Sequence, residues 1–155
     1  MLNQNPEMIF KNANQEIVPY DGSEITWRIS AYAVVVKLGG LLLAKSIHEK
    51  FYDVIGGGIE IGESIEEGLK REALEEAGAE VKIGPIMHVN EDWFYHKNGK
   101  FYHAVQLYYL AELVGDLAQP SDPQIESVVW APLDKPETYP VAHYVATIMK
   151  KLTDQ

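Results

Sequence analysis

The stretch that most constrains this chain begins at Gly56 and reads GGGIEIGESIEEGLKREALEEAG. Three consecutive glycines open the stretch, and seven glutamates follow within it. Only Lys70 and Arg71 oppose those glutamates inside the stretch. Because like charges repel at short range, a fold that keeps these side chains together needs a source of positive charge.

The same stretch carries the signals of a helix over residues 64–77. Ser64 with Glu67 three residues later matches a capping box, and Gly78 is placed to end the helix in a left-handed conformation. At about 100° per residue, an apolar stripe forms that should face the core. The stripe comprises Ile65, Leu69, Ala73 and Ala77.

Three of the glutamates, Glu72, Glu75 and Glu76, share one arc of this predicted helix. Glu76 falls within the apolar stripe and Glu72 at its edge, so burial adds to their mutual repulsion. Glu75 and Glu76 also lie near the helix C-terminus, where the helix dipole disfavours negative charge. A hard divalent cation such as Mg²⁺ or Mn²⁺ binds carboxylate oxygens and would offset the repulsion. A solvated acidic surface helix is the alternative interpretation.

The spacing of these residues resembles the Nudix box, the signature of the Nudix hydrolases. Gly57 is followed after five residues by Glu63, and then by the runs Arg71-Glu72-Ala73, Glu75-Glu76 and Gly78-Ala79. The resemblance implies a Nudix fold of the α+β class, in which helices flank a mixed sheet.

The box departs from the common family pattern at three positions. Many members have proline directly before the paired glycines, where this chain has Ile55, and bulky aliphatic residues where it has Ala73 and Ala79. Ala73 and Ala79 are still apolar, so we expect looser packing around an intact site.

The resemblance assigns a role to each polar residue of the box. It implies that a divalent cation, Mg²⁺ or Mn²⁺, is held by Gly56, Glu72, Glu75 and Glu76. Glu63 is expected to add to the metal site or to hold its loop, and Arg71 to orient a box glutamate through an ion pair. Gly57 and Gly78 are expected to be structural.

The implied activity is hydrolysis of a pyrophosphate bond in a nucleoside diphosphate derivative. Divalent cations neutralise the diphosphate and lower the pKa of bound water, and a water attacks one phosphorus in line. The general base is a box glutamate in some members and a loop carboxylate in others. Outside the box the candidates are Glu126, Glu91 and Asp92, and Glu126 is preferred because it begins a predicted strand after a loop.

Nucleoside triphosphates and dinucleoside polyphosphates are the favoured substrates. Tyr95 lies sixteen residues after the box, where some dinucleoside polyphosphate hydrolases of the family carry a tyrosine. The proline found at a similar distance in ADP-sugar hydrolases is absent, since Pro85 comes too early, which argues against ADP-ribose. Arg28 and Tyr32, with Trp27, are candidates for binding a base or phosphate.

Aromatic residues crowd the segment DWFYHKNGKFYHAVQLYY. Some are candidates for stacking on a nucleobase, but packing between paired strands is the commoner role of such residues. The five histidines of the chain show no metal-ligand spacing. Only His96 and His103, which flank a predicted hairpin, are kept as candidates for a role.

The rest of the chain predicts seven strands and a second helix. The strands are expected over residues 30–38, 41–45, 51–55, 79–83, 86–95, 101–113 and 125–131, and the helix over residues 141–152. Gly39-Gly40 and Asn98-Gly99 are expected to form tight hairpin turns.

Composition narrows the class of protein further. A length of 155 residues suits one domain over residues 1–155. The net charge of −10 repels a phosphate backbone, so a long nucleic acid is not an expected partner. The chain has no cysteine, no apolar run of membrane length and no secretory signal, so we expect a cytoplasmic protein without a membrane partner. The family resemblance adds a possible homodimer.

Two other functions stay open from sequence. One is a non-catalytic Nudix-fold module that binds a nucleotide and regulates a partner, although such a module has no need of every box glutamate. The other is an acidic structural protein whose helix binds Ca²⁺, although the loop does not follow the EF-hand pattern.

Overall fold

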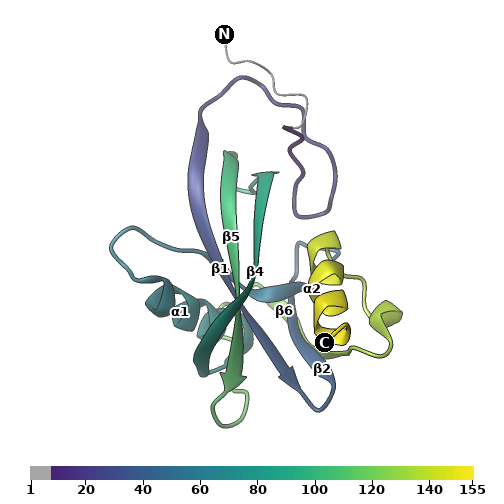
Figure 1. The fold of residues 1–155 in the computed structure, drawn as a ribbon. Helices are drawn as coiled ribbons and strands as arrows, with labels where there is room; N and C mark the ends of the chain where they lie inside the picture. The colour runs from purple at the N-terminus through teal and green to yellow at the C-terminus, as the bar shows by residue number, and fades with distance from the viewer. Residues whose placement is uncertain (1–7) are drawn as a thin grey trace.

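The computed structural model describes residues 8–155 as six strands, two helices and a 3₁₀ turn. In chain order the elements are β1 (Ile25–Lys37), β2 (Gly40–Ser46), β3 (Asp53–Gly58), α1 (Ile65–Ala77), β4 (Val81–Tyr95), β5 (Phe101–Leu113), β6 (Ile125–Pro132), η1 (Pro136–Thr138) and α2 (His143–Thr153). Figure 1 shows α1 and α2 on opposite sides of the strands. The predicted α+β class, a mixed sheet flanked by helices, is confirmed.

The strands form one sheet in the order β4-β5-β1-β3-β2-β6. β1 runs parallel to β5 over residues 25–35, and the other strand pairs are antiparallel. On its other side β1 pairs with β3 only over residues 30–33, and with β2 at residues 36–37. This long central strand therefore holds the two halves of the sheet together.

The alternation of side chains along β1 divides the core into two clusters. Ala31, Ala33 and Val35 point to the cluster that α1 covers, whereas Tyr32 and Val34 point to the cluster that α2 covers. Successive side chains of a strand face opposite sides of the sheet, which accounts for the two layers of core.

None of the helices described in residues 8–155 is long and apolar enough to cross a membrane.

Helix α1 confirms the predicted capping and apolar stripe. The Ser64 side chain accepts from the Glu67 N–H at 3.0 Å, and the Glu67 carboxylate accepts from the Ser64 N–H at 3.0 Å. Leu69, Ala73 and Ala77 are buried. Gly78 ends the helix at φ 60°, a left-handed conformation.

Three local predictions were wrong. The β1–β2 turn has Leu38-Gly39 at its centre, with φ angles of 51° and 77°, because Gly40 pairs with Lys37. The strand predicted over residues 51–55 instead runs from Asp53 to Gly58, because the three glycines pair with β1 in the ladder. The two strands predicted on either side of Pro85 are one strand, β4, whose register shifts between Ile83 and Ile86. An edge strand tolerates proline at such an irregularity.

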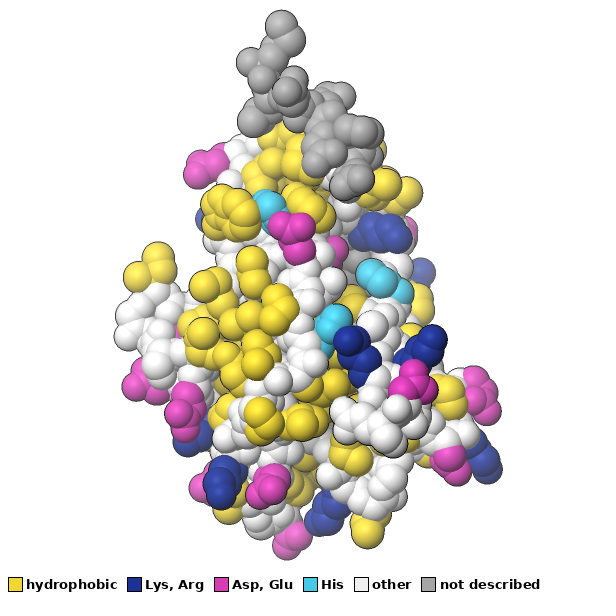
Figure 2. Space-filling view, viewed as in Figure 1, with side chains coloured by type: hydrophobic (Ala, Val, Ile, Leu, Met, Phe, Trp, Pro, Cys, Tyr) yellow, Lys and Arg dark blue, Asp and Glu magenta, His cyan; other side chains and the backbone are white. Residues whose placement is uncertain are grey.

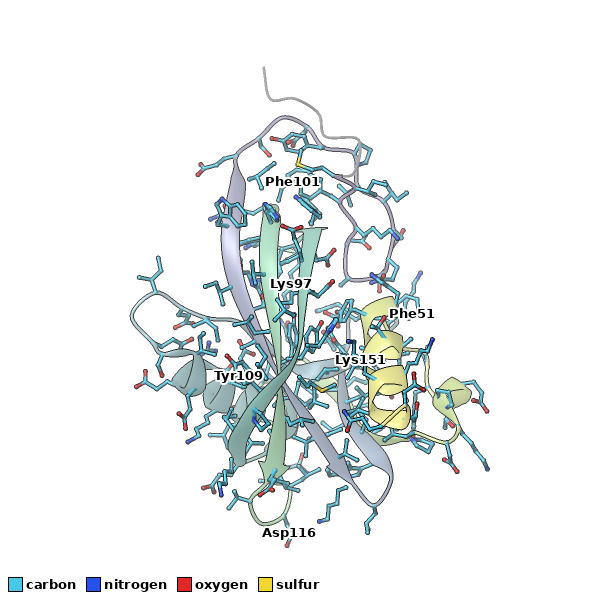
Figure 3. The ribbon with its side chains drawn as sticks, viewed as in Figure 1. Phe51, Lys97, Phe101, Tyr109, Asp116 and Lys151 are labelled. Carbon is cyan, nitrogen blue, oxygen red and sulfur yellow. The ribbon has the colours of Figure 1, made fainter. Side chains whose placement is uncertain are left out.

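Residues 8–24, which we call the N-terminal segment, pack against the tip of the sheet. Phe10 and Tyr20 contact Phe101, labelled in Figure 3, with ring centroids 4.9 and 5.1 Å apart. The Tyr95 N–H donates to the Lys11 carbonyl at 3.0 Å. Gln15 Oε1 and His143 Nδ1 lie 2.7 Å apart, which joins this segment to α2. The N-terminal segment is thus placed as a wall between the sheet and α2.

Gly78→Ala should destabilise the fold more than Gly62→Ala does. Both glycines have positive φ, at 60° and 97°, so each alanine carries backbone strain of about 1–2 kcal/mol. A Cβ at Gly78 would also lie 2.1 Å from the Ala118 carbonyl oxygen, whereas nothing lies within 4 Å of one at Gly62. Urea titration should show the larger loss of unfolding free energy for Gly78→Ala. Equal losses would contradict the predicted collision.

Candidate active site

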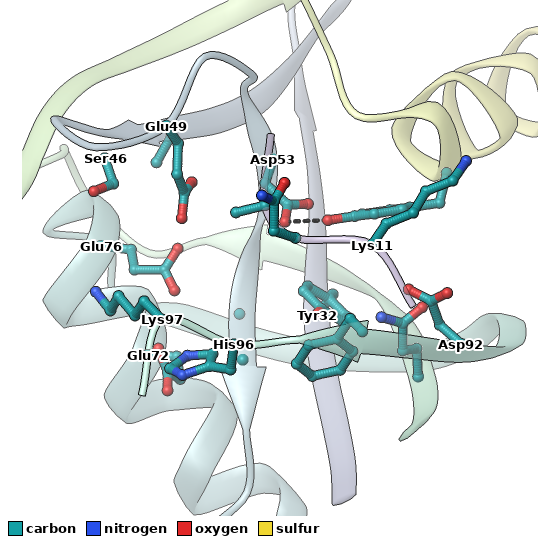
Figure 4. A pocket seen from close by; sticks show the side chains of 18 of the residues that line it. Lys11, Tyr32, Ser46, Glu49, Asp53, Glu72, Glu76, Asp92, His96 and Lys97 are labelled. Atoms are coloured by element: carbon teal, nitrogen blue, oxygen red, sulfur yellow. Dashed lines mark hydrogen bonds between the residues drawn. The ribbon is translucent and has the colours of Figure 1, made fainter. Parts of the chain in front are cut away.

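A cavity of about 410 Å³ opens between α1 and α2, with β1 and β3 as its floor (Figure 4). Carboxylates gather at the end beside α1, where Glu72, Glu75 and Glu76 line the wall. The N-terminal segment, β4 and α2 form the opposite end through Lys11, Asp92, His143 and neighbouring side chains. The cavity therefore has a strongly acidic end and an end of mixed polarity.

Arg71 binds three carboxylates beside this cavity. Its Nη2 and Nε donate to Glu63 at 2.8 and 3.1 Å, and its Nη1 donates to Glu72 at 3.1 Å and to Glu75 at 3.3 Å. These hydrogen bonds from Arg71, with one from the Glu60 N–H, lower the pKa of Glu63 to about 2. The guanidinium thus joins the loop before α1 to the first two glutamates of the arc.

Glu76 has no cationic partner among the described residues. Burial raises the pKa of the Glu76 carboxyl well above its usual range, and the nearby Glu72, Asp53 and Glu49 raise it further. In Figure 4 the carboxylates of Glu49 and Glu76 face each other across the acidic end. The repulsion that the sequence predicted is thus concentrated at Glu76, inside the cavity.

Sequence reasoning missed two acidic residues of this end, Glu49 and Asp53. Tyr144 Oη donates to Asp53 at 2.5 Å, and the Val54 N–H donates to it at 2.7 Å. Burial raises the pKa of Asp53 to about 7 and raises the pKa of Glu49. Both stand in or beside the predicted strand over residues 51–55, where no local signal shows that they face the predicted helix.

The donor set at the acidic end fits a hard divalent cation. It offers several carboxylate oxygens, and no cation of residues 8–155 forms an ion pair with the buried Glu76 carboxylate. Within those residues no three acidic or histidine side chains are already close enough together to hold an ion. Arg71 accounts for part of the distance between these carboxylates, because it binds Glu72 and Glu75 and holds them toward itself.

The second and third glycines of the triplet give space to functional side chains. A Cβ at Gly57 would lie 3.0 Å from Glu72 Oε1, and one at Gly58 would lie 2.6 Å from Arg28 Nε. The glycines therefore let a carboxylate of α1 and the Arg28 guanidinium lie directly on the β3 backbone. Gly58 is outside the fixed positions of the box.

Arg28 brings positive charge to the same end of the cavity. Its Nε donates to Ser30 Oγ at 3.0 Å, and its guanidinium lies 5.3 and 5.5 Å from the ring centroids of Phe94 and Tyr102. No carboxylate in the described part of the chain pairs with it. Arg28 is therefore held in place by aromatic rings while its charge stays available to an anion.

The other predicted substrate residues, Tyr32 and Tyr95, also line the cavity. Tyr32 stacks on the buried Tyr108 with ring centroids 4.9 Å apart. Lys97, which the sequence did not single out, lines the cavity as well and donates to Gln124 at 2.9 Å.

The three candidate bases from outside the box lie in different places. Asp92 lines the cavity, at the end near Lys11. Glu126 forms an ion pair with Lys45 and is not among the residues that line the cavity. Glu91 pairs with His103 at 2.8 Å, away from the cavity. The choice of Glu126 as general base stays a prediction.

Comparison with known proteins identifies the class to which this site belongs. A family model described as the NUDIX domain matches residues 26–153. The chain therefore belongs to the Nudix family, and the resemblance read from the box is confirmed.

Curated relatives and solved structures agree with that assignment. The chain is 35% identical over 111 residues to the NAD-capped RNA hydrolase NudC of Chromobacterium violaceum, covering 69% of this chain and 39% of that protein. The NudC of Pseudomonas aeruginosa is 31% identical over 123 residues, covering 77% and 42%. The chain thus spans less than half the length of these relatives.

Solved structures show the same fold at low identity. A MutT Nudix hydrolase of Burkholderia pseudomallei superposes with a TM-score of 0.68 at 24% identity, covering 81% of this chain and 98% of the other. An ADP-ribose pyrophosphatase of Streptococcus suis gives a TM-score of 0.61 at 17% identity, covering 81% and 87%.

Asp53→Asn should change how stability depends on pH. The folded-state pKa of about 7 exceeds the ordinary value of 3.8, so the folded protein holds a proton that the unfolded chain releases between about pH 4 and 7. Asp53 therefore lowers stability as the pH rises through that window, by on the order of a few kcal/mol in total. Asparagine carries no such proton, so Asp53→Asn should gain unfolding free energy over the wild type across the window.

Urea titrations from pH 4 to 8, in the presence of a chelator, measure this difference. Asp134→Asn, at an exposed position, is the matched control and should give a curve parallel to the wild type. A constant difference between Asp53→Asn and the wild type would show that Asp53 does not hold the proton.

Proposed function

We propose that this protein is a divalent-metal-dependent pyrophosphohydrolase acting on a nucleoside diphosphate derivative. The observation that carries the proposal is the meeting of Glu72, Glu75 and Glu76 with the Arg28 guanidinium, which pairs with no carboxylate of residues 8–155, at one end of a cavity. A diphosphate needs both kinds of group, because a cation bound by carboxylates and a positively charged side chain together neutralise it.

The residues proposed to hold the cation are Glu72, Glu75, Glu76 and the Gly56 carbonyl. When bound, Mg²⁺ or Mn²⁺ neutralises phosphoryl oxygens and lowers the pKa of a water. The side chains of this chain do the rest. Arg71 holds Glu63, Glu72 and Glu75 in fixed positions, and Arg28 binds a phosphate oxygen from the sheet side.

The general base is proposed to be Glu49, with Glu126 as the competing candidate. Glu49 lines the cavity and faces Glu76, and burial raises its pKa above the ordinary value, which makes the carboxylate a stronger base. Glu126 is half exposed, and Lys45 would have to release it before it could reach the cavity.

The substrate is proposed to be a nucleoside triphosphate, a dinucleoside polyphosphate or another dinucleotide with a diphosphate bridge. Tyr95 lines the cavity, in keeping with the sequence-based choice of dinucleoside polyphosphates. The curated relatives are described as NAD-capped RNA hydrolases, which adds nicotinamide dinucleotides to the compounds to be tested. Metal-dependent cleavage of one of these classes would establish the reaction. No cleavage by folded, metal-bound protein would favour a nucleotide-binding module.

A cytoplasmic homodimer is the proposed state of the protein. Figure 2 shows apolar side chains gathered over the strands on one face, and Ile29, Ile86 and Val89 of those strands are 47–56% exposed. Exposed apolar area on a sheet is a common site of association. Analytical ultracentrifugation tests this, and a monomer at micromolar concentration would contradict it.

Glu76→Gln should lower kcat by roughly 100-fold or more on the substrate identified, while the protein stays folded. The substitution removes a carboxylate that burial and like charges destabilise, so the unfolding free energy should not fall. Steady-state kinetics with Mg²⁺ and a thermal melt measure the two effects. Near-normal turnover in a well-folded Glu76→Gln protein would remove its assigned role.

Glu49→Gln and Glu126→Gln separate the two candidate bases. Loss of a general base lowers kcat by roughly 100- to 10,000-fold. We expect a loss of this size for Glu49→Gln and less than a few-fold for Glu126→Gln, because the latter carboxylate binds Lys45 outside the cavity. The reverse result would establish Glu126 as the base and exclude Glu49.

A further inference from the structure

A second hollow of about 730 Å³, which we call the outer groove, lies between the first residues of β1 and the loop before α1. It exists because β3 stops pairing with β1 at Ser30 and Gly58, and the last contact is the Ile59 N–H donating to the Ile29 carbonyl at 2.9 Å. Beyond it the chain turns away through residues 60–64. Residues 25–28 of β1 therefore have β5 on one side and, within residues 8–155, no strand on the other.

The outer groove is continuous with the catalytic cavity. Arg28, Glu72 and His96 line both hollows. A diphosphate bound at Glu72 and Arg28 can therefore place one substituent in the cavity and the other in the outer groove.

Trp27, on the wall of the outer groove, presents an indole ring on which a base can stack. Trp27 is 69% exposed, and one face of its ring stacks on His103 with centroids 3.9 Å apart. His103 stacks on Trp93 with centroids 4.5 Å apart and binds Glu91 at 2.8 Å. These contacts fix the Trp27 ring while leaving it largely open. Ile61, fully exposed, stands on the opposite lip.

The charges of the outer groove select the kind of group that it can accept. Arg28 supplies positive charge where the groove meets the cavity, whereas the carboxylate of Glu60, which is 73% exposed and 4.0 Å from Arg71 Nη2, stands on the lip. A further phosphate on that lip would be repelled, while an aromatic base would find Trp27 and the isoleucines. The groove thus suits a nucleoside better than an extended phosphate chain.

We propose that the outer groove binds the second nucleoside of a dinucleotide substrate, with its base stacked on Trp27. This assignment rests on the proposed function, because it takes the diphosphate to lie at Glu72 and Arg28. It narrows the substrate class to diphosphates with a base-bearing group on each side, in preference to nucleoside triphosphates.

NADH and ADP-ribose test the assignment, because they share the same adenylate half and diphosphate and differ only in the dihydronicotinamide base. Base stacking on an aromatic side chain changes affinity by roughly five- to 150-fold. Trp27→Ala should raise KM for NADH at least about fivefold and leave kcat/KM for ADP-ribose within twofold of the wild type. Trp27→Phe, which keeps an aromatic ring, should recover most of the loss. Leu38→Ala, at a 98% exposed position of the β1–β2 turn that lines neither hollow, is the control and should leave the kinetics with both compounds unchanged.

Calorimetric titration with Ca²⁺ in place of Mg²⁺ separates this assignment from the proposed reaction. Tighter binding of NADH than of ADP-ribose, lost in Trp27→Ala, supports the outer groove even if neither compound is hydrolysed. Equal affinities for the two compounds, no binding of either, or equal effects of Trp27→Ala on both would overturn it. Absence of hydrolysis with selective binding would reject the proposed reaction alone.

Discussion

The hydrogen bonds of Arg71 are the interaction on which the site depends. A single guanidinium binds Glu63 from the loop and Glu72 and Glu75 from α1. Its positive charge holds the three carboxylates close together and offsets part of their mutual repulsion. Hydrogen bonds between a guanidinium and carboxylates are strong and directional, so they fix the orientation of the side chains. The loop before α1, the second half of the helix and the end of β3 are thereby held in one arrangement.

What Arg71 leaves unbalanced is as informative as what it binds. Glu76, Glu49 and Asp53 face a common space, none of them forms an ion pair with a cation of residues 8–155, and the pKa values of all three are raised. Such crowding lowers the stability of the protein alone and is relieved by a bound cation. Strongly shifted carboxyl groups in a cavity are typical of functional sites. The site is therefore suited to bind a cation and then an anionic substrate.

The arrangement of the strands determines which side chains meet at this site. β1 carries Arg28 on the cavity face and Trp27 on the next position, while the short pairing with β3 leaves the strand edge open beside them. The cavity and the outer groove join where Arg28 lies against Gly58. A glycine outside the fixed positions of the family box thus has a reason to be there, since any side chain would displace the guanidinium.

The sequence by itself determined the helix, its caps, its buried stripe and the arc of glutamates, because these depend on residues three and four positions apart. It also determined the family, through a spacing of fixed residues within one continuous stretch. Local sequence patterns could not show which residues share one cavity, because separate segments of the fold bring them together. This holds for Glu49, Asp53, Asp92 and Lys97. The partners of Glu126 and Glu91 were equally hidden, because Lys45 and His103 come from neighbouring strands. Only the strand order and the early end of the β1–β3 ladder decided which faces became a cavity and which became a groove.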